Sequence, residues 1–248
     1  MTKENEKLDE VKKDFIEDIV QDKNELKNKY KKTDNEITEE RLSSWNPKTK
    51  LGIMVKNGKI KDLNEILDNN IKILEPEIVD SLTRVESDLL FSGQAKGKFG
   101  GGKRRAWRQS QKKTEEGNIV TFSVLVVVGD KKGHVGIGLG KAKETLPARE
   151  KALRKAKLNI IKVNRGSGSF EGSSKEPHSI PFKTEGKCGS VRMKLIPAPQ
   201  GTGLVIGNEG KKILRLAGIE DIYSKSFGQT RTTINYAKAI ISALRKLR

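Results

Sequence analysis

The apolar run IVTFSVLVVVG at residues 119–129 constrains the fold more than any other part of the sequence. It is rich in β-branched side chains and long enough to form a strand. The tetrapeptide DKKG that follows predicts a turn, and HVGIGLGKAK at 134–143 predicts a second strand, so we expect a β-hairpin. Gly136, Gly138 and Gly140 recur at every second position and therefore share one face of that strand. A face without side chains lets either a helix or an RNA backbone approach closely.

The segment ETLPAREKALRKAKLNII at 144–161 predicts a helix after this hairpin, with Pro147 near its first turn. Its inward stripe is apolar and comprises Ala148, Ala152, Leu153, Ala156 and Ile160. Its other face is basic and comprises Arg149, Lys151, Arg154, Lys155 and Lys157. A charged helix face is usually only solvated, but a face built for solubility mixes both signs. Nucleic-acid binding is therefore the second interpretation of this face.

The C-terminal residues 177–248 predict a compact α+β domain with the order β-β-α-β-α. Its strands are expected in HSIPFKTE, which starts at His178, in SVRMKLIPA and in IEDIYSKSFG. Its helices are expected in GNEGKKILRLAG, which ends at Gly218, and in TTINYAKAIISALRKLR. In SVRMKLIPA the apolar residues alternate with Arg192 and Lys194, which predicts a half-buried strand with a positively charged outer face.

The charge of the chain is segregated. Residues 1–91 carry 17 Lys and Arg against 21 Asp and Glu, whereas residues 92–248 carry 33 against 11. Such a field attracts a polyanion, because Lys and Arg that neutralise phosphates release condensed counterions. An anionic membrane surface is the competing partner, but the sequence has no long apolar run and no lipidation signal. With 34% hydrophobic and 33% charged residues, two small cores fit better than one large core.

Several classes of site are not predicted. Cys188 is the only cysteine, and His134 and His178 are the only histidines, so we expect no disulfide within the chain, no zinc site and no cofactor. We interpret both histidines as hydrogen-bonded structural residues. No nucleophile has an obvious base, so we expect a protein without enzymatic activity. The acidic start lacks the apolar core of a secretory signal, and a lone cysteine suits the reducing cytoplasm.

Three segments precede the hairpin. Residues 1–44 form a charged extension with some apolar residues at helical spacing, either a solubilising tail or a partner-docking helix. Residues 45–91 predict a small helical segment, with a turn at 56–59 and two short helices in IKDLNEIL and PEIVDSLTRV. Residues 92–118 are rich in glycine, Lys and Arg and contain only two aromatic residues, so we expect them to fold only on RNA.

Within that segment, GGGKRRAWRQ combines arginines with one tryptophan. Guanidinium groups fork onto phosphates, while an indole can stack on an unpaired base. The alternative is a flexible linker whose charges are only solvated. A second linker, rich in Ser and Gly, starts at Arg165; it either offers backbone amides to phosphate or simply connects two domains. The predicted RNA-binding residues are Lys103, Arg104, Arg105, Trp107, Arg108, Lys112, Lys113, Lys131, Lys132, Lys141, Lys143, Arg149, Arg154, Lys155, Arg165, Arg192 and Lys194.

The block GKCGSVRMKLIPAPQGTGLVIGNEGKKILRLAG at 186–218, with SKEPHSIPF upstream, resembles the universal small-subunit ribosomal protein "S five" family in its archaeal and eukaryotic form. The stretch WNPKTKLGIMVKNGKIKDLNEI at 45–66 resembles the extra segment of the archaeal type. The resemblance implies an α+β fold, with a double-stranded-RNA-binding-like N-terminal domain and linker at 119–176 followed by the C-terminal domain. It also implies a structural, cytoplasmic role in the small subunit.

The resemblance further implies binding to small-subunit ribosomal RNA, a position where the head meets the body near the messenger RNA entry channel, and an influence on translational accuracy. The family's neighbours are the proteins "S four" and "S eight", and the matching helix gives Lys211, Lys212 and Arg215 as protein-contact candidates. The family's RNA-entering loop matches residues 112–118, where Glu115 and Glu116 depart from a purely basic loop.

A rival interpretation comes from VIGNEGKKI at 205–213, because a GXXG loop in this context is also the signature of a KH domain. The alternative function is therefore a free-standing RNA-binding regulator or RNA chaperone, of KH-like or double-stranded-RNA-binding type.

Overall fold

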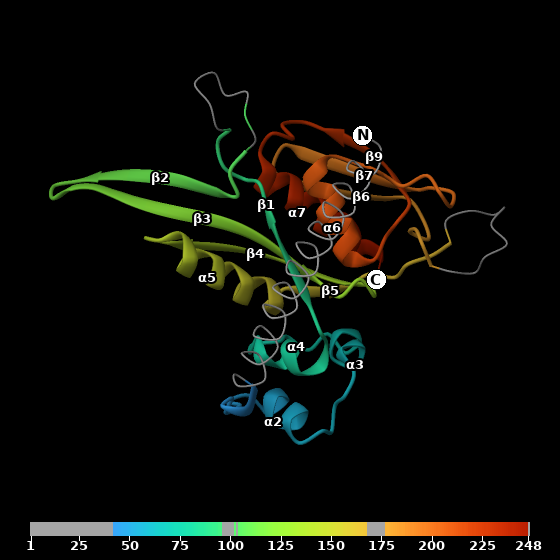
Figure 1. Cartoon of the computed structure of the whole chain (residues 1–248). Helices are drawn as coiled ribbons and strands as arrows, with labels where there is room; N and C mark the ends of the chain where they lie inside the picture. The colour runs from blue at the N-terminus through green and yellow to red at the C-terminus, as the bar shows by residue number, and fades with distance from the viewer. Residues whose placement is uncertain (1–41, 96–101, 103, 168–176, 248) are drawn as a thin grey trace, which may run out of the picture. The chain divides into compact units, whose positions relative to one another are not determined.

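A computed structural model describes residues 42–95, 102, 104–167 and 177–247 (Figure 1). The chain divides into two units, residues 1–46 and 47–248, and the second unit contains every element described below. The charged extension predicted for residues 1–44 lies outside the described residues up to position 41, and so does the predicted RNA-binding residue Lys103.

Three short helices open the second unit: α2 (Lys50–Lys56), α3 (Leu63–Asp68) and α4 (Glu77–Leu82). Helices α3 and α4 confirm the two predicted helices, whereas α2 was not foreseen. Helix α2 begins where the Thr49 hydroxyl accepts a hydrogen bond from the Gly52 amide at 3.1 Å, which is a normal N-cap. The interpretation of residues 45–91 as helical is wrong at its end, because Glu86–Leu90 form strand β1, which pairs antiparallel with β3.

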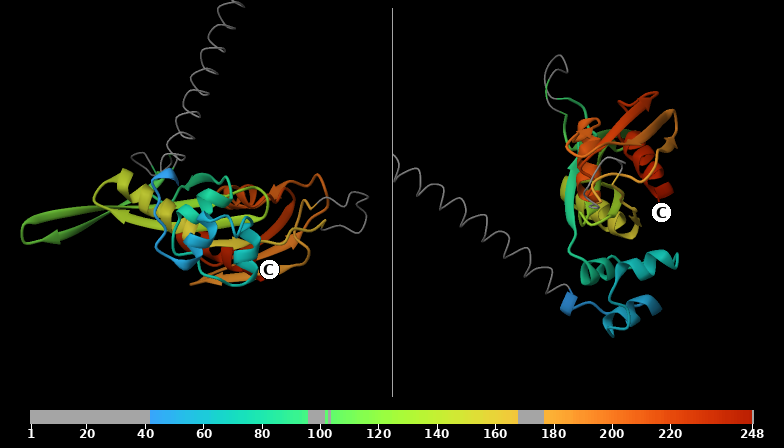
Figure 2. Two further views of the ribbon diagram at one scale, coloured as in Figure 1. Left: turned by 90° about the horizontal axis from the view of Figure 1, so that it is seen from below. Right: turned by 90° about the vertical axis from the view of Figure 1, so that its right-hand side faces the viewer.

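The larger sheet has the order β1-β3-β4-β5, and β2 joins it on β3. Its remaining strands are β2 (Trp107–Thr114), β3 (Gly117–Gly129), β4 (His134–Ala142) and β5 (Ile160–Lys162). The predicted hairpin is confirmed as β3–β4. Strand β1 pairs with the second half of β3 and β2 with its first half. The pair β2–β3 runs outward as a long ribbon beyond the rest of the sheet (Figure 2).

The expectation that residues 92–118 fold only on RNA is wrong for their last part. Residues 107–114 form β2, and a two-residue turn at Glu115 and Glu116 leads into β3. Backbone pairing with β3 explains this, because a ladder satisfies the N–H and C=O groups of a polar strand without an apolar core. The segment 112–118, expected as a loop, is therefore the tip of a hairpin.

Helix α5 (Thr145–Leu158) covers one face of the larger sheet. Its buried alanines pack on Val124, Val126 and Val128 of β3. A Cβ added to Gly138 would lie 2.1 Å from the carbonyl oxygen of Ala152, so the glycine row of β4 exists for the close approach of this helix. The predicted stripe is wrong at its end, because Ile160 belongs to β5.

The smaller sheet has the order β6-β7-β9-β8, with β8 parallel to β9. Its elements, in chain order, are β6 (Thr184–Cys188), β7 (Val191–Pro197), β8 (Leu204–Val205), α6 (Asn208–Ala217), β9 (Ile222–Phe227) and α7 (Thr233–Leu244), followed by a 3₁₀ turn at Arg245–Leu247. Strand β8 was not foreseen. The strand predicted from His178 begins only at Thr184, because Pro181 has no amide hydrogen to continue a ladder.

The larger hydrophobic core joins the two sheets. Leu125 and Val127, on the face of β3 away from α5, belong to the same buried cluster as Met193 of β7, Leu214 of α6 and Ile240 of α7. The expectation of two small cores is therefore only half right, since this core is shared. None of the helices that the structure describes has the length and apolar character needed to cross a bilayer.

Candidate nucleic-acid interface

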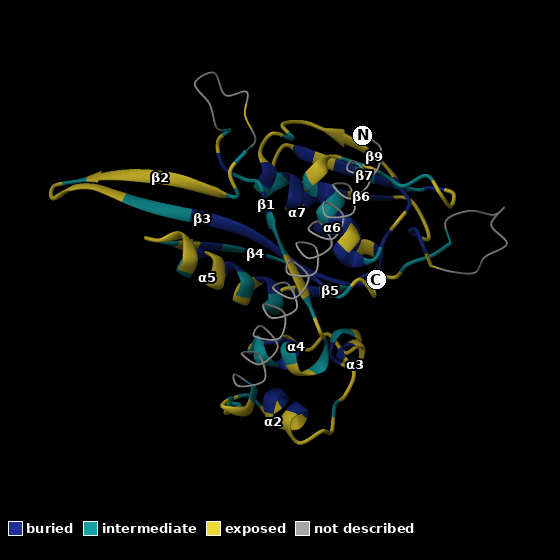
Figure 3. Ribbon diagram, viewed as in Figure 1, coloured by how far each residue is buried: buried dark blue, intermediate teal, exposed yellow. Residues whose placement is uncertain are grey.

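The ribbon formed by β2 and the first residues of β3, which we call the hairpin arm, is exposed over most of its length (Figure 3). Its strands are joined by polar contacts: the hydroxyls of Ser110 and Thr121 lie 2.8 Å apart, and the Thr114 hydroxyl donates to the Gly117 carbonyl at 2.7 Å. An exposed two-stranded ribbon of this kind is a shape that can enter a groove of a nucleic acid.

The face of the arm away from α5 carries a basic row. Arg108 lies opposite Ser123 in the β2–β3 ladder, and Ser123 lies opposite Lys141 in the β3–β4 ladder. Directly opposed residues of antiparallel strands share a face, so the two cations flank one small hydroxyl residue. Lys112 lies on the same face nearer the tip, since side chains alternate along a strand.

Trp107 lies on the other face of the arm. It is opposite Val124, which packs under α5, and 37% of its surface is exposed. Arg108 therefore does not surround Trp107, as GGGKRRAWRQ suggested, but lies on the opposite face. Arg105 is exposed, and its backbone is fixed by hydrogen bonds with Gly93 and Gln94. Lys113 shares the Trp107 face, nearer the tip.

A cavity of about 560 Å³ lies where the arm meets the start of α7, and we call it the arginine groove. Its charged side chains are Arg104, Arg108 and Arg231, and no Asp or Glu is among its lining residues. The Arg104 guanidinium donates to the Thr233 hydroxyl at 3.2 Å and to the Arg231 carbonyl at 3.3 Å, which ties the segment just before β2 to the start of α7. Three guanidinium groups without a carboxylate form a surface suited to phosphate.

Arg231 was missed by sequence reasoning. It stands in GQTRTT, where no run of basic residues signals a site. Only the fold brings it beside Arg104 and Arg108, which lie more than a hundred residues earlier in the chain.

The outer face of α5 carries Arg149, Lys151, Arg154 and Lys155 in exposed positions, as predicted. Lys157 differs, because its ammonium lies 2.6 Å from a carboxylate oxygen of Asp80 in α4. This ion pair ties the helical segment to α5. Lys143, just before α5, and Lys132, in the β3–β4 turn, are exposed as well.

A second basic cavity brings together residues for which different roles were predicted. Lys131 and Arg165, expected to bind RNA, line it with Lys211 and Arg215, expected to contact protein, and with Glu220. The ammonium of Lys131 donates to Glu86 at 2.7 Å, so part of its charge is compensated.

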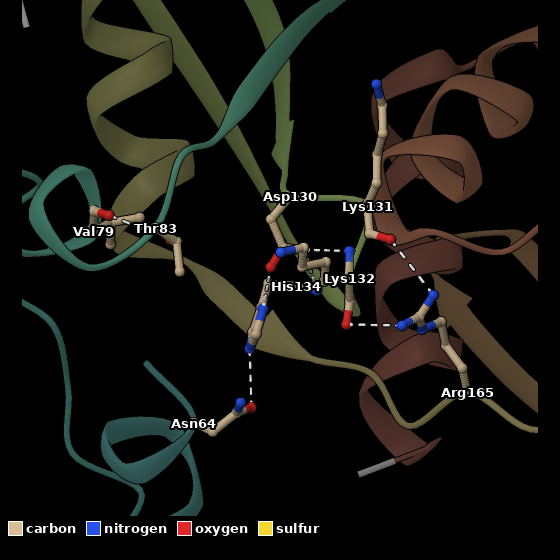
Figure 4. Close-up of polar contacts among 8 residues, drawn as sticks. All are labelled: Asn64, Val79, Thr83, Asp130, Lys131, Lys132, His134 and Arg165. Atoms are coloured by element: carbon tan, nitrogen blue, oxygen red, sulfur yellow. Dashed lines mark hydrogen bonds and ion pairs between the residues drawn. The ribbon is translucent and has the colours of Figure 1, made fainter. Parts of the chain in front are cut away.

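Arg165 also has a structural task that its linker sequence did not reveal. Its guanidinium donates to the carbonyls of Lys132 at 3.2 Å and Lys131 at 3.5 Å (Figure 4). It also donates to the Gly218 carbonyl at 3.2 Å. These contacts join the β3–β4 turn to the end of α6, where Gly218 takes the left-handed conformation of a C-cap.

Lys212, the remaining protein-contact candidate, points back into the molecule. Its ammonium donates to the Leu89 carbonyl at 2.6 Å and lies 3.9 Å from the ring centroid of Phe91. Lys211 and Arg215 are therefore better placed than Lys212 to meet a partner.

Both histidines are buried beside a carboxylate, and the predicted hydrogen bonding is confirmed for His134. His134 Nδ1 lies 2.5 Å from Asp130 and its Nε2 lies 3.1 Å from Asn64 (Figure 4). Burial acts to raise the pKa of Asp130, but hydrogen bonds from His134 and from backbone amides outweigh it and hold that pKa below its ordinary value. His178 Nδ1 lies 2.9 Å from a carboxylate oxygen of Asp221 but makes no hydrogen bond, so the predicted hydrogen bonding is not confirmed for this ring nitrogen. Among the described residues, no group of His, Cys, Asp and Glu is arranged to hold a metal ion.

The VIGNEGKKI segment is a strand-to-helix turn. Gly207 is the N-cap of α6, and Gly210 is buried within its first turn. A Cβ on Gly210 would lie 2.7 Å from the Ile206 side chain and 3.0 Å from the Tyr236 hydroxyl. The second glycine is thus used for packing, whereas a KH loop needs its glycines against a nucleic-acid backbone.

Comparison with known proteins gives the same family for both halves of the chain. Residues 93–164 match the model of "Ribosomal protein S5, N-terminal domain", and residues 186–248 match "Ribosomal protein S5, C-terminal domain". "Small ribosomal subunit protein uS5" of Nanoarchaeum equitans is 52% identical over 207 residues, covering 83% of this chain and 89% of the relative. The proteins of the same name from Staphylothermus marinus and Methanocaldococcus jannaschii are 49% and 47% identical, covering 84% and 83% of this chain and 91% and 88% of the relatives.

Proposed function

This chain belongs to the ribosomal protein S5 family, a family of structural, non-enzymatic ribosomal proteins, and from that premise we propose that it binds small-subunit ribosomal RNA through the hairpin arm and the arginine groove. The basic outer face of α5 lies on the opposite side of the larger sheet, and we propose it as a separate RNA contact. As a constituent of cytoplasmic small subunits, the protein would stabilise the RNA around it rather than transform a substrate.

One observation carries the proposal: the arginine groove collects three guanidinium groups and no carboxylate beside an exposed, basic ribbon. Such a surface gains little from a neutral protein partner, whereas each phosphate contact releases counterions. The arm supplies reach, because a projecting ribbon extends between RNA segments to phosphates that a flat surface cannot contact.

The position of the protein in the small subunit is a further part of the proposal. We place the protein at the junction of head and body near the messenger RNA entry channel, where it would contribute to translational accuracy. Lys211 and Arg215, together with the second basic cavity, are the surface we assign to a neighbouring protein, with "S four" and "S eight" as the expected neighbours. The exposed position of Arg215, and the place of both side chains in the lining of that cavity, support this assignment.

Co-sedimentation tests the proposal. The tagged chain is expressed in cells and the lysate is fractionated on a sucrose gradient at physiological salt. We expect the tagged chain to sediment with small subunits. It should be released when the subunits are dissociated into RNA and protein. A chain that stays at the top of the gradient while it binds other RNAs is instead a free-standing regulator or chaperone.

A further inference from the structure

The smaller sheet has one face covered by α6 and α7 and a second face that carries polar and aromatic side chains. Val191, Met193 and Leu195 of β7 are fully buried on the covered side. On the other side, which we call the open face, lie Glu185, Lys187, Arg192, Lys194, Ile196, Tyr223, Lys225 and Phe227. All are exposed except Lys194 and Ile196, which are half-buried, and Figure 3 shows β9 exposed along most of its length.

The register of the sheet fixes how these side chains lie. Lys187, Arg192 and Phe227 form one row across β6, β7 and β9, because each is opposite the next in its ladder. Lys194 and Lys225 are opposed in the neighbouring row, beside Glu185. Tyr223 and Phe227 are four residues apart on β9 and therefore share the face, about 13 Å from each other.

The ring of Phe227 lies between two positive charges. The ammonium groups of Lys194 and Lys225 lie 5.7 Å and 5.6 Å from the ring centroid of Phe227. Phe227 is 37% exposed and Tyr223 41% exposed. Four cations, Lys187, Arg192, Lys194 and Lys225, face a single acid, Glu185, whose carboxylate lies 3.5 Å from Lys194.

This composition distinguishes between kinds of occupant. Lysine is depleted in protein–protein interfaces, and their buried centre is poor in charge, so a face with four cations around an exposed phenylalanine fits a protein partner badly. Single-stranded nucleic acid has the complementary composition, since its bases stack on aromatic side chains and its phosphates follow basic ones. A paired RNA helix does not, because its base faces are stacked inside the helix.

We propose that the open face is a second RNA-binding site, which takes an unpaired RNA segment by stacking bases on Phe227 and Tyr223 while Arg192, Lys194 and Lys225 hold the backbone. The inference rests on the proposed function in that the ligand is again RNA. It adds a separate surface with a different specificity, for base faces rather than for phosphate alone.

The test is binding of the full chain to a short fluorescent oligouridylate, compared with an abasic ribose-phosphate strand of the same length. Phe227→Ala and Phe227→Leu are expected to bind the oligouridylate about 5- to 150-fold more weakly, the range that corresponds to one lost base–aromatic stack. Phe227→Tyr keeps a ring and is expected to bind like the unmodified chain. Phe182→Ala is the matched control, because Phe182 is a 53% exposed phenylalanine outside the open face.

The abasic strand separates stacking from charge. We expect the unmodified chain and Phe227→Leu to bind it equally. The proposal is overturned if Phe227→Leu binds the oligouridylate as tightly as the unmodified chain, or if this variant loses the same affinity for the abasic strand as for the oligouridylate. It is also overturned if the unmodified chain does not bind the oligouridylate at all. If instead Phe227→Leu releases another ribosomal protein while oligouridylate binding is unchanged, the face is a protein interface and the proposal is wrong.

The same assay with a structured fragment of small-subunit ribosomal RNA keeps the two proposals apart. Replacing Arg108 and Arg231 of the arginine groove is expected to weaken binding of the fragment and leave the oligouridylate unaffected. Failure of the open face therefore leaves the proposed function standing. If neither the unmodified chain nor the variant at Arg108 and Arg231 binds the fragment, the proposed function is wrong.

Discussion

The arginine groove leads to a prediction about salt dependence. Replacing Arg108 and Arg231 with glutamine removes two of its three guanidinium groups and keeps side chains of polar character. Arg104 is left in place, because its hydrogen bonds to Thr233 and to the Arg231 carbonyl hold the segment just before β2 against the start of α7. The double variant should therefore fold normally and bind RNA less tightly.

The magnitude follows from the number of phosphates released. Each neutralised phosphate contributes roughly 0.7 to the slope of log K against log salt on a single strand and roughly 0.9 on a duplex. If each of the two guanidinium groups neutralises one phosphate, the slope of the double variant is shallower by about 1.4 to 1.8. Raising the salt about fourfold then weakens the unmodified chain by about 7- to 12-fold more than it weakens the variant.

The assay is equilibrium binding of a structured fragment of small-subunit ribosomal RNA at a series of salt concentrations. Lys59→Gln with Lys61→Gln is the matched control, because it removes two exposed positive charges between α2 and α3, away from the groove. The control should keep the slope of the unmodified chain. A groove variant whose slope is also unchanged refutes the reasoning, since its two guanidinium groups then neutralise no phosphate.

Two further predictions concern stability. Gly138→Ala places a Cβ 2.1 Å from the Ala152 carbonyl oxygen and must push α5 off the sheet, so the free energy of unfolding in urea should fall by about 3 kcal/mol. Lys151→Ala, on the outer face of α5, should lower it by less than about 0.5 kcal/mol. Equal losses would mean that the helix moves away from the sheet at no cost. Asp130→Asn should lower stability at neutral pH. Because the pKa of Asp130 is held below its ordinary value of 3.8 in the folded chain, its contribution is present above that value and is lost as the pH falls through the folded pKa, so the variant should show a flatter decline in acid. Parallel acid curves for the two proteins would contradict this.

Local periodicity was sufficient for the central part of the fold. The β3–β4 hairpin and α5 follow from alternation, a turn tetrapeptide and an apolar stripe, and all of these lie within neighbouring residues. The alternation in β7 likewise predicted which side is buried, since Met193 is fully enclosed whereas Arg192 is exposed. In these elements, the residues that become buried are already spaced at the period of a strand or a helix in the sequence.

Elements that depend on a distant partner were not predictable in this way. Strand β2 has almost no apolar alternation, and β1 lies in a segment with helical character; both are strands because they pair with β3. The same reason applies to the site. Arg231 joins Arg104 only through the start of α7, and the carbonyl contacts of Arg165 exist only when the β3–β4 turn meets α6.

RNA binding through the arm and the arginine groove can be examined by mapping RNA–protein crosslinks on small subunits that contain this chain. We expect crosslinks at Trp107 and Arg108 of the arm and at Arg231 of the groove, all to small-subunit ribosomal RNA. Crosslinks confined to the helical segment at 50–82, with none at the arm or the groove, would contradict this proposal.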